Sequence, residues 1–277
     1  MAADLHMHSI FSDGSKTPEE LIEMAEEKGL KTISLTDHDT VAGIERAIEC
    51  GRERGVEVIP GIELSTLYNG LDVHILGYFI DFHSSLLLKE INRFFSNRRE
   101  RAKKIVKKLN ELGVMISFDD VRRECSEYFV GRPHIARAML RAGYIDDMKE
   151  AFSNRYIARE GKAYVRKYQL STEEGILLIS SAGGIPVLAH PYLINLEEPF
   201  GNREIRELKK TGLLGIEVYH SKHPAKIKDY YHNLADELEL LITGGSDYHG
   251  DNSPEIEMGD PAIGDEYVEK LKEAGQN

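Results

Sequence analysis

The chain has 277 residues, of which 41% are hydrophobic and 30% charged, a composition typical of a soluble folded protein that excludes fibrous and disordered classes. Its net charge of −12 argues against binding to duplex nucleic acid, whose phosphates favour a basic surface, but a small anionic substrate fits if metal ions supply positive charge. The two cysteines, Cys50 and Cys125, form no CxxC pair, so we expect any metal to be bound through nitrogen and oxygen. No apolar stretch reaches the length that spans a bilayer and no signal peptide is recognisable, so we expect a cytoplasmic protein without a membrane partner.

Short apolar stretches alternate with longer amphipathic ones along most of the chain, a pattern typical of parallel strands joined by crossover helices. The first helix has the clearest start, because Thr17 can cap it, Pro18 suits its first position and Glu20 completes a capping box, and Gly29 is expected to end it. Further helices are expected at residues 41–54, 172–184, 203–212 and 225–239. Seven strands are expected, at residues 3–9, 31–40, 56–66, 72–80, 185–191, 215–221 and 240–250.

The alternation stops at about residue 84 and resumes at about residue 170. The sequence between these points is helix-rich and more basic, and it contains no clear buried strand. We therefore expect residues 1–90 and 170–277 to form one α/β barrel, and residues 91–169 to form a helical subdomain inserted into it.

Residue types that bind metal ions stand at the ends of nearly all the expected strands. His6 and His8 are two residues apart, so on a strand they point to the same face, and the fourth strand carries His74 near its start. Because a parallel barrel gathers its strand ends at one face, residues distant in the sequence would meet there. The candidates at or just beyond the strand ends are His6, His8, Asp13, Asp37, His38, Asp39, Glu63, His74, His190, Glu217, His220, Asp247 and His249.

This set of side chains indicates metal chemistry. Imidazole and carboxylate groups without thiolate suit zinc, manganese or iron, and their number exceeds what one tetrahedral ion can use, so we predict two or three divalent metal ions as cofactor. Closely spaced ions can activate a bridging hydroxide and neutralise phosphoryl oxygens, which predicts hydrolysis of a phosphate ester. The alternative is that the histidines only complete hydrogen bonds at buried strand ends, which leaves their recurrence at one end of nearly every strand unexplained.

The series DLHMHS, DGS, TDHDT, GIELS, HILGY, LAHP, EVYHS and GGSDYHG resembles the PHP (polymerase and histidinol phosphatase) superfamily along nearly the whole chain. The resemblance implies a distorted (β/α)7 barrel with a trinuclear metal site. It also implies the ligands: His6, His8, Glu63 and Asp247 for the first ion, Asp13, His38 and His249 for the second, and His74 and His190 with bridging Glu63 for the third. Asp13 stands where some members of the superfamily have histidine, which keeps a ligand and affects metal preference.

The segment GRPHIARAML, followed by GKAYVRK, is similar to bacterial PHP phosphoesterases that remove the 3′-phosphate from nucleoside 3′,5′-bisphosphates and trim short oligoribonucleotides from the 5′ end. This resemblance makes a nucleotide, or short single-stranded RNA, the expected substrate. Guanidinium groups can bind a phosphate that is not being cleaved with two parallel hydrogen bonds. The expected substrate-binding residues are Arg132, His134, Arg137, Lys162, Arg166 and His223, and the candidates for proton donation to the leaving oxygen are His220 and His134.

A metal-dependent amide hydrolase on a related barrel is a distant option, which the basic insertion disfavours. Two other functions remain open at this point. One is a histidinol phosphatase or another small-molecule phosphatase, for which the basic insertion is less suited than for a substrate with two phosphates. The other is a non-catalytic metal-binding accessory module, such as some polymerase-associated PHP domains, against which the intact set of ligands argues. The same ligands accept zinc, manganese and iron, so all three metals remain candidates.

Overall fold

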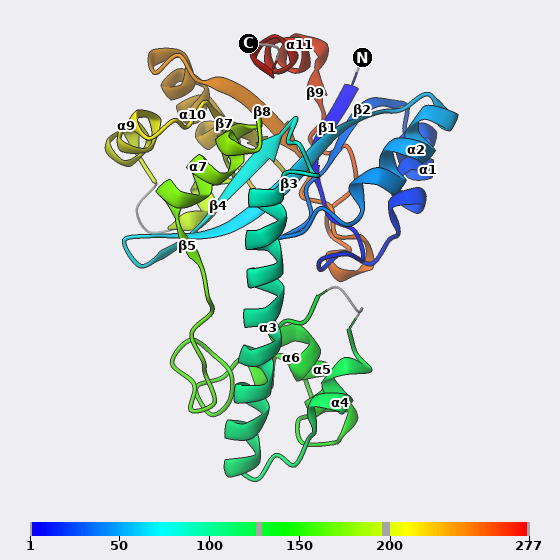
Figure 1. The fold of residues 1–277 in the computed structure, drawn as a ribbon, viewed down its shortest axis with the longest axis vertical. Helices are drawn as coiled ribbons and strands as arrows, with labels where there is room; N and C mark the ends of the chain where they lie inside the picture. Colours follow the sequence, from blue (N-terminus) through cyan, green and yellow to red (C-terminus); the bar gives the residue numbers. More distant parts are fainter. Residues whose placement is uncertain (1, 126–128, 196–199, 276–277) are drawn as a thin grey trace. The chain divides into compact units, whose positions relative to one another are not determined.

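The computed structural model describes residues 2–125, 129–195 and 200–275, and the chain forms two compact units (Figure 1). The barrel unit comprises Met1–Lys89 and Gln169–Asn277, and the helical unit comprises Glu90–Tyr168. All nine strands in the described part of the chain belong to the barrel unit.

A single mixed sheet forms the centre of the barrel unit, with its strands in the order β8-β7-β6-β4-β3-β2-β1-β9 and β5 beside β3. Just beyond β8 the chain meets β1, because the Asp247 N–H donates to the His6 carbonyl and the His8 N–H donates to the Tyr248 carbonyl, both at 2.9 Å. The sheet therefore nearly closes into a barrel. Its strands are β1 (Ala2–Met7), β2 (Leu30–Leu35), β3 (Glu57–Tyr68), β4 (Leu71–Tyr78), β5 (Leu170–Ser171), β6 (Ile185–Leu188), β7 (Gly215–His220), β8 (Leu241–Gly245) and β9 (Ile263–Gly264).

Helices surround this sheet (Figure 1). The first begins as the sequence predicts, because the Thr17 hydroxyl accepts from the Glu20 N–H at 3.2 Å and the Glu20 carboxylate accepts from the Thr17 N–H at 2.7 Å. Gly29, with φ +72°, follows the end of this helix. The helices of the barrel unit are α1 (Pro18–Glu27), α2 (Ile44–Arg54), α7 (Thr172–Ser181), α8 (Pro191–Ile194), α9 (Asn202–Lys210), α10 (Ala225–Glu237), the 3-10 helix Gly250–Asn252 and α11 (Asp265–Gly275).

The direction of β4 differs from the prediction. All seven predicted strands are present, as β1 to β4 and β6 to β8, but β4 pairs antiparallel with both β3 and β6. The reason is the two-residue turn Asn69-Gly70, in which both residues have positive φ, +48° and +87°. Such a turn can only join antiparallel strands, whereas a parallel pair needs a long crossover. The start of β4, which carries His74, therefore lies at the face where its parallel neighbours end.

The helical unit has a hydrophobic core of its own. Buried Ile105 and Leu109 come from its longest helix, and they cluster with Val121, Ile135 and Met139 from the helices that follow. Removing such apolar surface from water stabilises a fold by roughly 25 cal/mol per Å². The helices are α3 (Ser85–Glu111), which begins in the barrel unit, α4 (Phe118–Arg122), α5 (Arg132–Arg141) and α6 (Met148–Ala151).

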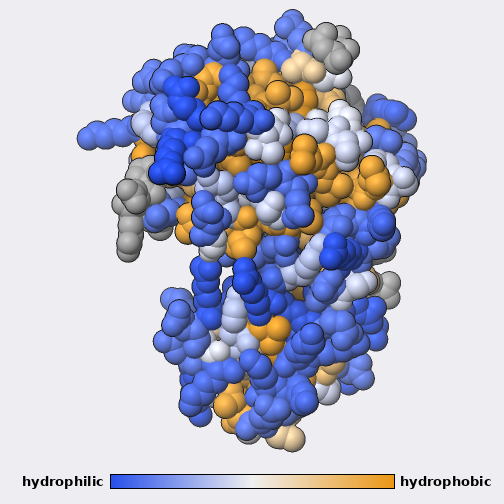
Figure 2. Space-filling view, turned by 60° about the vertical axis from the view of Figure 1, so that its left-hand side comes forward, coloured by the Kyte–Doolittle hydropathy of each residue, from blue (hydrophilic) through white to orange (hydrophobic). Residues whose placement is uncertain are grey.

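The surface is mostly polar. Figure 2 shows hydrophilic side chains over most of the face in view, with hydrophobic side chains in separate patches between them. Among the described residues, no helix is both long enough and apolar enough to cross a membrane.

Candidate metal centre

The barrel topology brings all nine predicted ligands into one cluster in the barrel unit. His6 and His8 come from β1 and the residue after its end, and Asp247 and His249 follow β8. An isolated parallel bridge between His38 and Glu63 extends the pairing of β2 with β3 and places these two side chains together. Three sets of them have ligand atoms within 4.8 Å of one another: His8, Asp13, His38 and His249; His6, His8, Glu63 and Asp247; and His38, Glu63 and His74.

Glu63 is the centre of this cluster. Its carboxylate is fully buried and belongs to the middle of β3. Five imidazole nitrogens lie within 2.8–3.3 Å of its two oxygens: Nε2 of His6, Nε2 of His8, Nδ1 of His38, Nδ1 of His74 and Nε2 of His190. One carboxylate thus links imidazoles from four strands or strand ends.

Asp13 and Asp247 complete the cluster on either side. Asp13 lies in the loop after β1, with its Oδ1 3.2 Å from His249 Nε2. Asp247 has its Oδ1 3.1 Å from His8 Nε2 and 3.4 Å from His6 Nε2. Both side chains are more exposed than that of Glu63, Asp13 at 35% and Asp247 at 15%. The cluster is therefore accessible to solvent at these two carboxylates.

The donor atoms fit metal ions. Buried polar atoms nearly always have hydrogen-bond partners, yet His8 Nε2, His38 Nδ1 and Asp13 Oδ1 have none among the described residues. His38 Nδ1 lies 3.0 Å from Glu63 Oε2, but the contact does not have the geometry of a hydrogen bond. Lone pairs that converge in this way, from imidazole and carboxylate without thiolate, are the arrangement that divalent zinc, manganese or iron binds.

The pKa shifts show that the carboxylates and imidazoles of the cluster interact strongly. Burial would favour the neutral His8 ring, but the charges of Asp247 and Glu63 outweigh it and raise the pKa of His8 to about 10. Burial would likewise raise the pKa of Glu63, but the surrounding histidines, His38 first, hold it well below its usual range. The pKa of Asp247 is lowered in the same way: burial would raise it, but the charge of His6 outweighs burial. The carboxylates therefore stay ionised and attract cations.

The family of the chain follows from this geometry together with comparisons with known proteins. The PHP domain model matches residues 4–156, more than half of the chain. The chain belongs to the PHP domain family. It is 32% identical over 247 residues to the 3′,5′-nucleoside bisphosphate phosphatase of Chromobacterium violaceum, covering 89% of this chain and 86% of the relative. It is 32% identical over 258 residues to the 5′-3′ exoribonuclease Rnm of Escherichia coli, covering 92% and 87%.

A solved structure agrees with this assignment. The protein from Bifidobacterium adolescentis that is described as a metal-dependent phosphoesterase has a TM-score of 0.86 at 31% identity, covering 97% of this chain and 94% of that chain. The PHP barrel described above is therefore that of a metal-dependent phosphoesterase, a hydrolase, and its histidines and carboxylates can hold the metal.

The PHP barrel also brings Glu217 into the cluster, a candidate from the expected strand ends that the resemblance assigns to no ion. Glu217, in the middle of β7, accepts from the His190 N–H at 2.7 Å and lies 2.9 Å from His6 Nδ1. It forms a further group of possible ligands with His6 and His220. The sequence indicates a possible ligand at this position, but it does not indicate these contacts.

Three more carboxylates fix the loops of the PHP barrel. Asp37 accepts from the Ser9 N–H at 2.7 Å and from the Ser9 hydroxyl at 2.6 Å. Asp4 accepts from the Ser246 N–H and hydroxyl at 2.9 and 2.6 Å, and Asp39 accepts from the Ser65 N–H at 2.7 Å. These contacts hold in place the loops that carry the ligands.

Backbone strain also concentrates at this face. Asp39, His190 and Asp247 have φ of +54°, +26° and +59°, in the left-handed region that residues other than glycine seldom adopt. Each of them follows a different strand, β2, β6 or β8. Such strain persists only where the surrounding contacts enforce it, and it is concentrated at functional sites in many proteins.

The two other histidines predicted in the PHP barrel lie beside the cluster. His220 is fully buried, with its Nε2 3.3 Å from Asp247 Oδ2, and its Nδ1 accepts from the Lys222 N–H at 3.1 Å. His223 is buried next to it, with ring centroids 5.2 Å apart. Burial lowers the pKa of His223 to about 4, so this ring is neutral.

The remaining predicted residues belong to the helical unit. The Arg132 guanidinium donates to the Ile157 carbonyl at 3.1 Å, and the Gly131 N–H donates to His134 Nδ1 at 3.0 Å at the start of α5. Arg137 is half-buried and Lys162 is exposed. Arg166 lines a groove along α3 together with Lys104, Lys107, Lys108, Glu111, Tyr164 and Val165. The substrate contacts of these five residues stay a prediction.

Proposed function

We propose that this PHP phosphoesterase removes the 3′-phosphate from nucleoside 3′,5′-bisphosphates and trims short single-stranded RNA from its 5′ end. The observation that carries the proposal is the similarity to two relatives named for these activities, each over about nine tenths of the chain. Both substrates contain a nucleoside with phosphate on its 5′ and 3′ oxygens. One site that binds the 5′-phosphate and cleaves at the 3′ oxygen can therefore serve both.

The proposed ligands follow the three sets of atoms around Glu63. His6, His8, Glu63 and Asp247 would hold one ion, Asp13, His38 and His249 a second, and His74 and His190 with Glu63 a third. Ions held there would activate a water molecule and neutralise the phosphoryl oxygens during in-line displacement.

The other proposed roles belong to the chain's own side chains. The leaving 3′ oxygen needs a proton, and in His220 the proton resides on Nε2 because Nδ1 accepts from the backbone. His134 likewise accepts at Nδ1 and carries its proton on Nε2. These two histidines are the proposed donors, and His223 beside His220 is proposed to orient the substrate.

The 5′-phosphate would be bound by cations of the helical unit. No described residue forms an ion pair with Arg137, Lys162 or Arg166, so their charges are available to an anion. Arg132 offers a planar guanidinium that can form two parallel hydrogen bonds with a phosphate. Substrates without a 5′-phosphate should therefore bind more weakly.

The test is a comparison of two substrates. Purified protein with manganese should release inorganic phosphate from adenosine 3′,5′-bisphosphate much faster than from adenosine 5′-monophosphate, and the remaining product should be the 5′-monophosphate. Equal rates, undetectable rates or formation of the 3′-monophosphate would refute the substrate assignment. Faster turnover of histidinol phosphate would favour the small-molecule phosphatase instead.

A further inference from the structure

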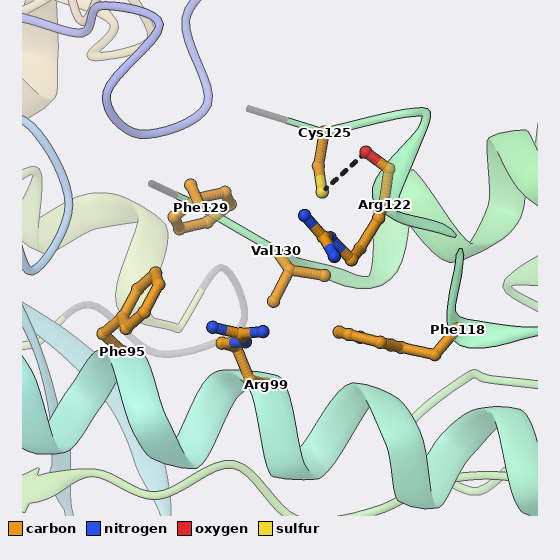
Figure 3. A pocket seen from close by; sticks show the side chains of 7 residues that line it. All are labelled: Phe95, Arg99, Phe118, Arg122, Cys125, Phe129 and Val130. Carbon is orange, nitrogen blue, oxygen red and sulfur yellow. Dashed lines mark hydrogen bonds between the residues drawn. The ribbon is translucent and has the colours of Figure 1, made fainter. Parts of the chain in front are cut away.

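The helical unit contains a pocket of its own, which shares no residue with the metal centre. The pocket has a volume of about 270 Å³. Its wall includes three phenyl rings from separate segments, Phe95 of α3, Phe118 of α4 and Phe129 before α5, with Val130 between them (Figure 3). We call it the phenyl pocket.

Two guanidinium groups face this pocket. Arg99 lies one turn after Phe95 on α3, and Arg122 ends α4; in Figure 3 both side chains point toward the space between the rings. Within the described part of the chain, neither forms an ion pair or donates a side-chain hydrogen bond, and the lining includes no acidic residue. Nearby Arg123, by contrast, is paired with Asp120 at 2.8 Å.

Arginines without an acidic partner beside an apolar wall are informative in a chain with a net charge of −12. Arg99 contacts the wall itself, with its Cζ 5.6 Å from the centroid of the Phe95 ring. Acidic partners are abundant in this protein, yet none neutralises these two side chains among the described residues. The pocket therefore combines apolar rings with positive charge that is available to a ligand. A ligand that matches both has a flat aromatic body and an anionic group.

The chemistry that fits this pocket is that of a nucleotide. Proteins that bind single-stranded RNA combine positive charge for the backbone with aromatic side chains on which bases stack, and arginine matches the geometry of phosphate. The volume lies just below the roughly 300–1,000 Å³ typical of sites for whole small-molecule ligands. The pocket therefore has room for one base and not for several.

We propose that the phenyl pocket binds one nucleotide of a short single-stranded RNA, with the base against Phe118 and Phe129 and the adjacent phosphate on Arg99 and Arg122. This inference rests on the proposed function only in taking RNA as a substrate. A binding site in the helical unit would hold RNA by residues that take no part in metal binding.

The proposal is tested by binding and not by turnover. The probe is pentaadenylate with a 3′ fluorescent label, its affinity for the full chain measured by fluorescence anisotropy in EDTA so that the RNA stays intact. Phe118→Leu, which keeps apolar volume but removes the ring, should weaken binding about tenfold. Arg122→Gln should weaken binding and reduce the slope of log affinity against log salt concentration by about 0.7, the value for one lost phosphate contact on a single strand.

Arg123→Gln is the matched control, because this exposed arginine follows Arg122 directly but does not line the pocket. It should bind the pentamer like the parent. The proposal fails if Phe118→Leu and Arg122→Gln bind within twofold of the parent, or if Arg123→Gln loses as much affinity as Arg122→Gln. It also fails if inorganic tetrapolyphosphate or an acidic peptide competes as well as unlabelled pentaadenylate. Because no metal is present, these outcomes are independent of phosphate release from the bisphosphate.

Discussion

Glu63 concentrates the chemistry of the metal centre in one carboxylate. Its two oxygens lie within 3.3 Å of five imidazoles, and it is fully buried. A negative charge in such a place can bridge metal ions, whereas an amide of the same shape offers one neutral oxygen. Replacing Glu63 by glutamine therefore removes the charge of this side chain while keeping its shape.

Glu63→Gln should lose bound metal and reduce phosphate release by at least about 100-fold, because it removes a ligand charge without changing volume. Metal content is measured by mass spectrometry after dialysis, and activity by phosphate release. Glu57→Gln, an exposed carboxylate on the same strand, should retain both properties. Full metal content and activity in Glu63→Gln would contradict the central role of this residue.

Glu217 is expected to affect metal binding by positioning two ligand residues, His190 and His6. It holds the His190 N–H and the His6 ring, so Glu217→Gln should lower metal affinity about 10- to 100-fold. Because the ligands themselves remain, excess manganese should restore most of the activity. A titration of activity with manganese separates this outcome from a folding defect, which added metal would leave uncorrected at every concentration.

The candidate site could be found from the sequence in large part, and Glu217 shows where this stops. His6, His190 and Asp247 stand at or near strand ends, and barrel topology fixes where strand ends meet. The partners of Glu217 lie 27 and 211 residues away along the chain. Such contacts depend on distances between strands, which no local pattern encodes.

At the scale of elements, the meeting of β8 with β1 decides whether the ligands converge. A methyl group on Gly245 would lie 2.4 Å from the His6 backbone nitrogen and 2.6 Å from the His6 Cβ. These neighbours are backbone or close to it, so they cannot rotate away as the end of a flexible side chain would. The absence of a side chain at Gly245 is thus what allows the two strands to approach.

Gly245→Ala should therefore cost about 3 kcal/mol of unfolding free energy, as overpacking does, and should also reduce metal binding. Gly70→Ala is the control, since its added methyl group contacts nothing within 4 Å and only the positive φ is unfavourable, at about 1 kcal/mol. Urea denaturation of both variants measures the difference. Equal costs would show that the close approach is unimportant.

The sequence allowed most elements to be predicted, but not all of their directions. The start of α1 is encoded within four residues, from Thr17 to Glu20, and the structure confirms it. The Asn69-Gly70 pair is typical of a two-residue hairpin turn and so also signals that β4 reverses. The alternation of strands and helices along the rest of the chain favours a parallel arrangement, which holds for the neighbouring strands but not for β4. The two-residue strands β5 and β9 were missed, because two residues carry no periodicity.

At the scale of the whole molecule, metal binding and stability should be coupled in one unit only. Every group of possible ligands found among the described residues belongs to the barrel unit. A ligand that binds only the folded state stabilises it, by about 2.7 kcal/mol at 100 times its dissociation constant. The described residues of the helical unit form a separate hydrophobic core and include no such group of ligands.

EDTA should therefore increase hydrogen exchange in the barrel unit while leaving α5 of the helical unit unchanged. The measurement is hydrogen–deuterium exchange by mass spectrometry, with peptides from β1 and β8 compared with peptides from α5. Addition of manganese should reverse the effect. Equal loss of protection in both units would show that they unfold as one.

The positive φ values of Asp39, His190 and Asp247 also bear on how this protein would respond to selection. Each costs roughly 1–2 kcal/mol relative to an ordinary backbone conformation, and glycine would relieve that cost. Selection for heat resistance alone should therefore favour glycine at Asp247, whose carboxylate is a proposed metal ligand, at the expense of activity. Laboratory evolution of this chain would need to reward turnover and thermal tolerance together in order to keep its catalytic face.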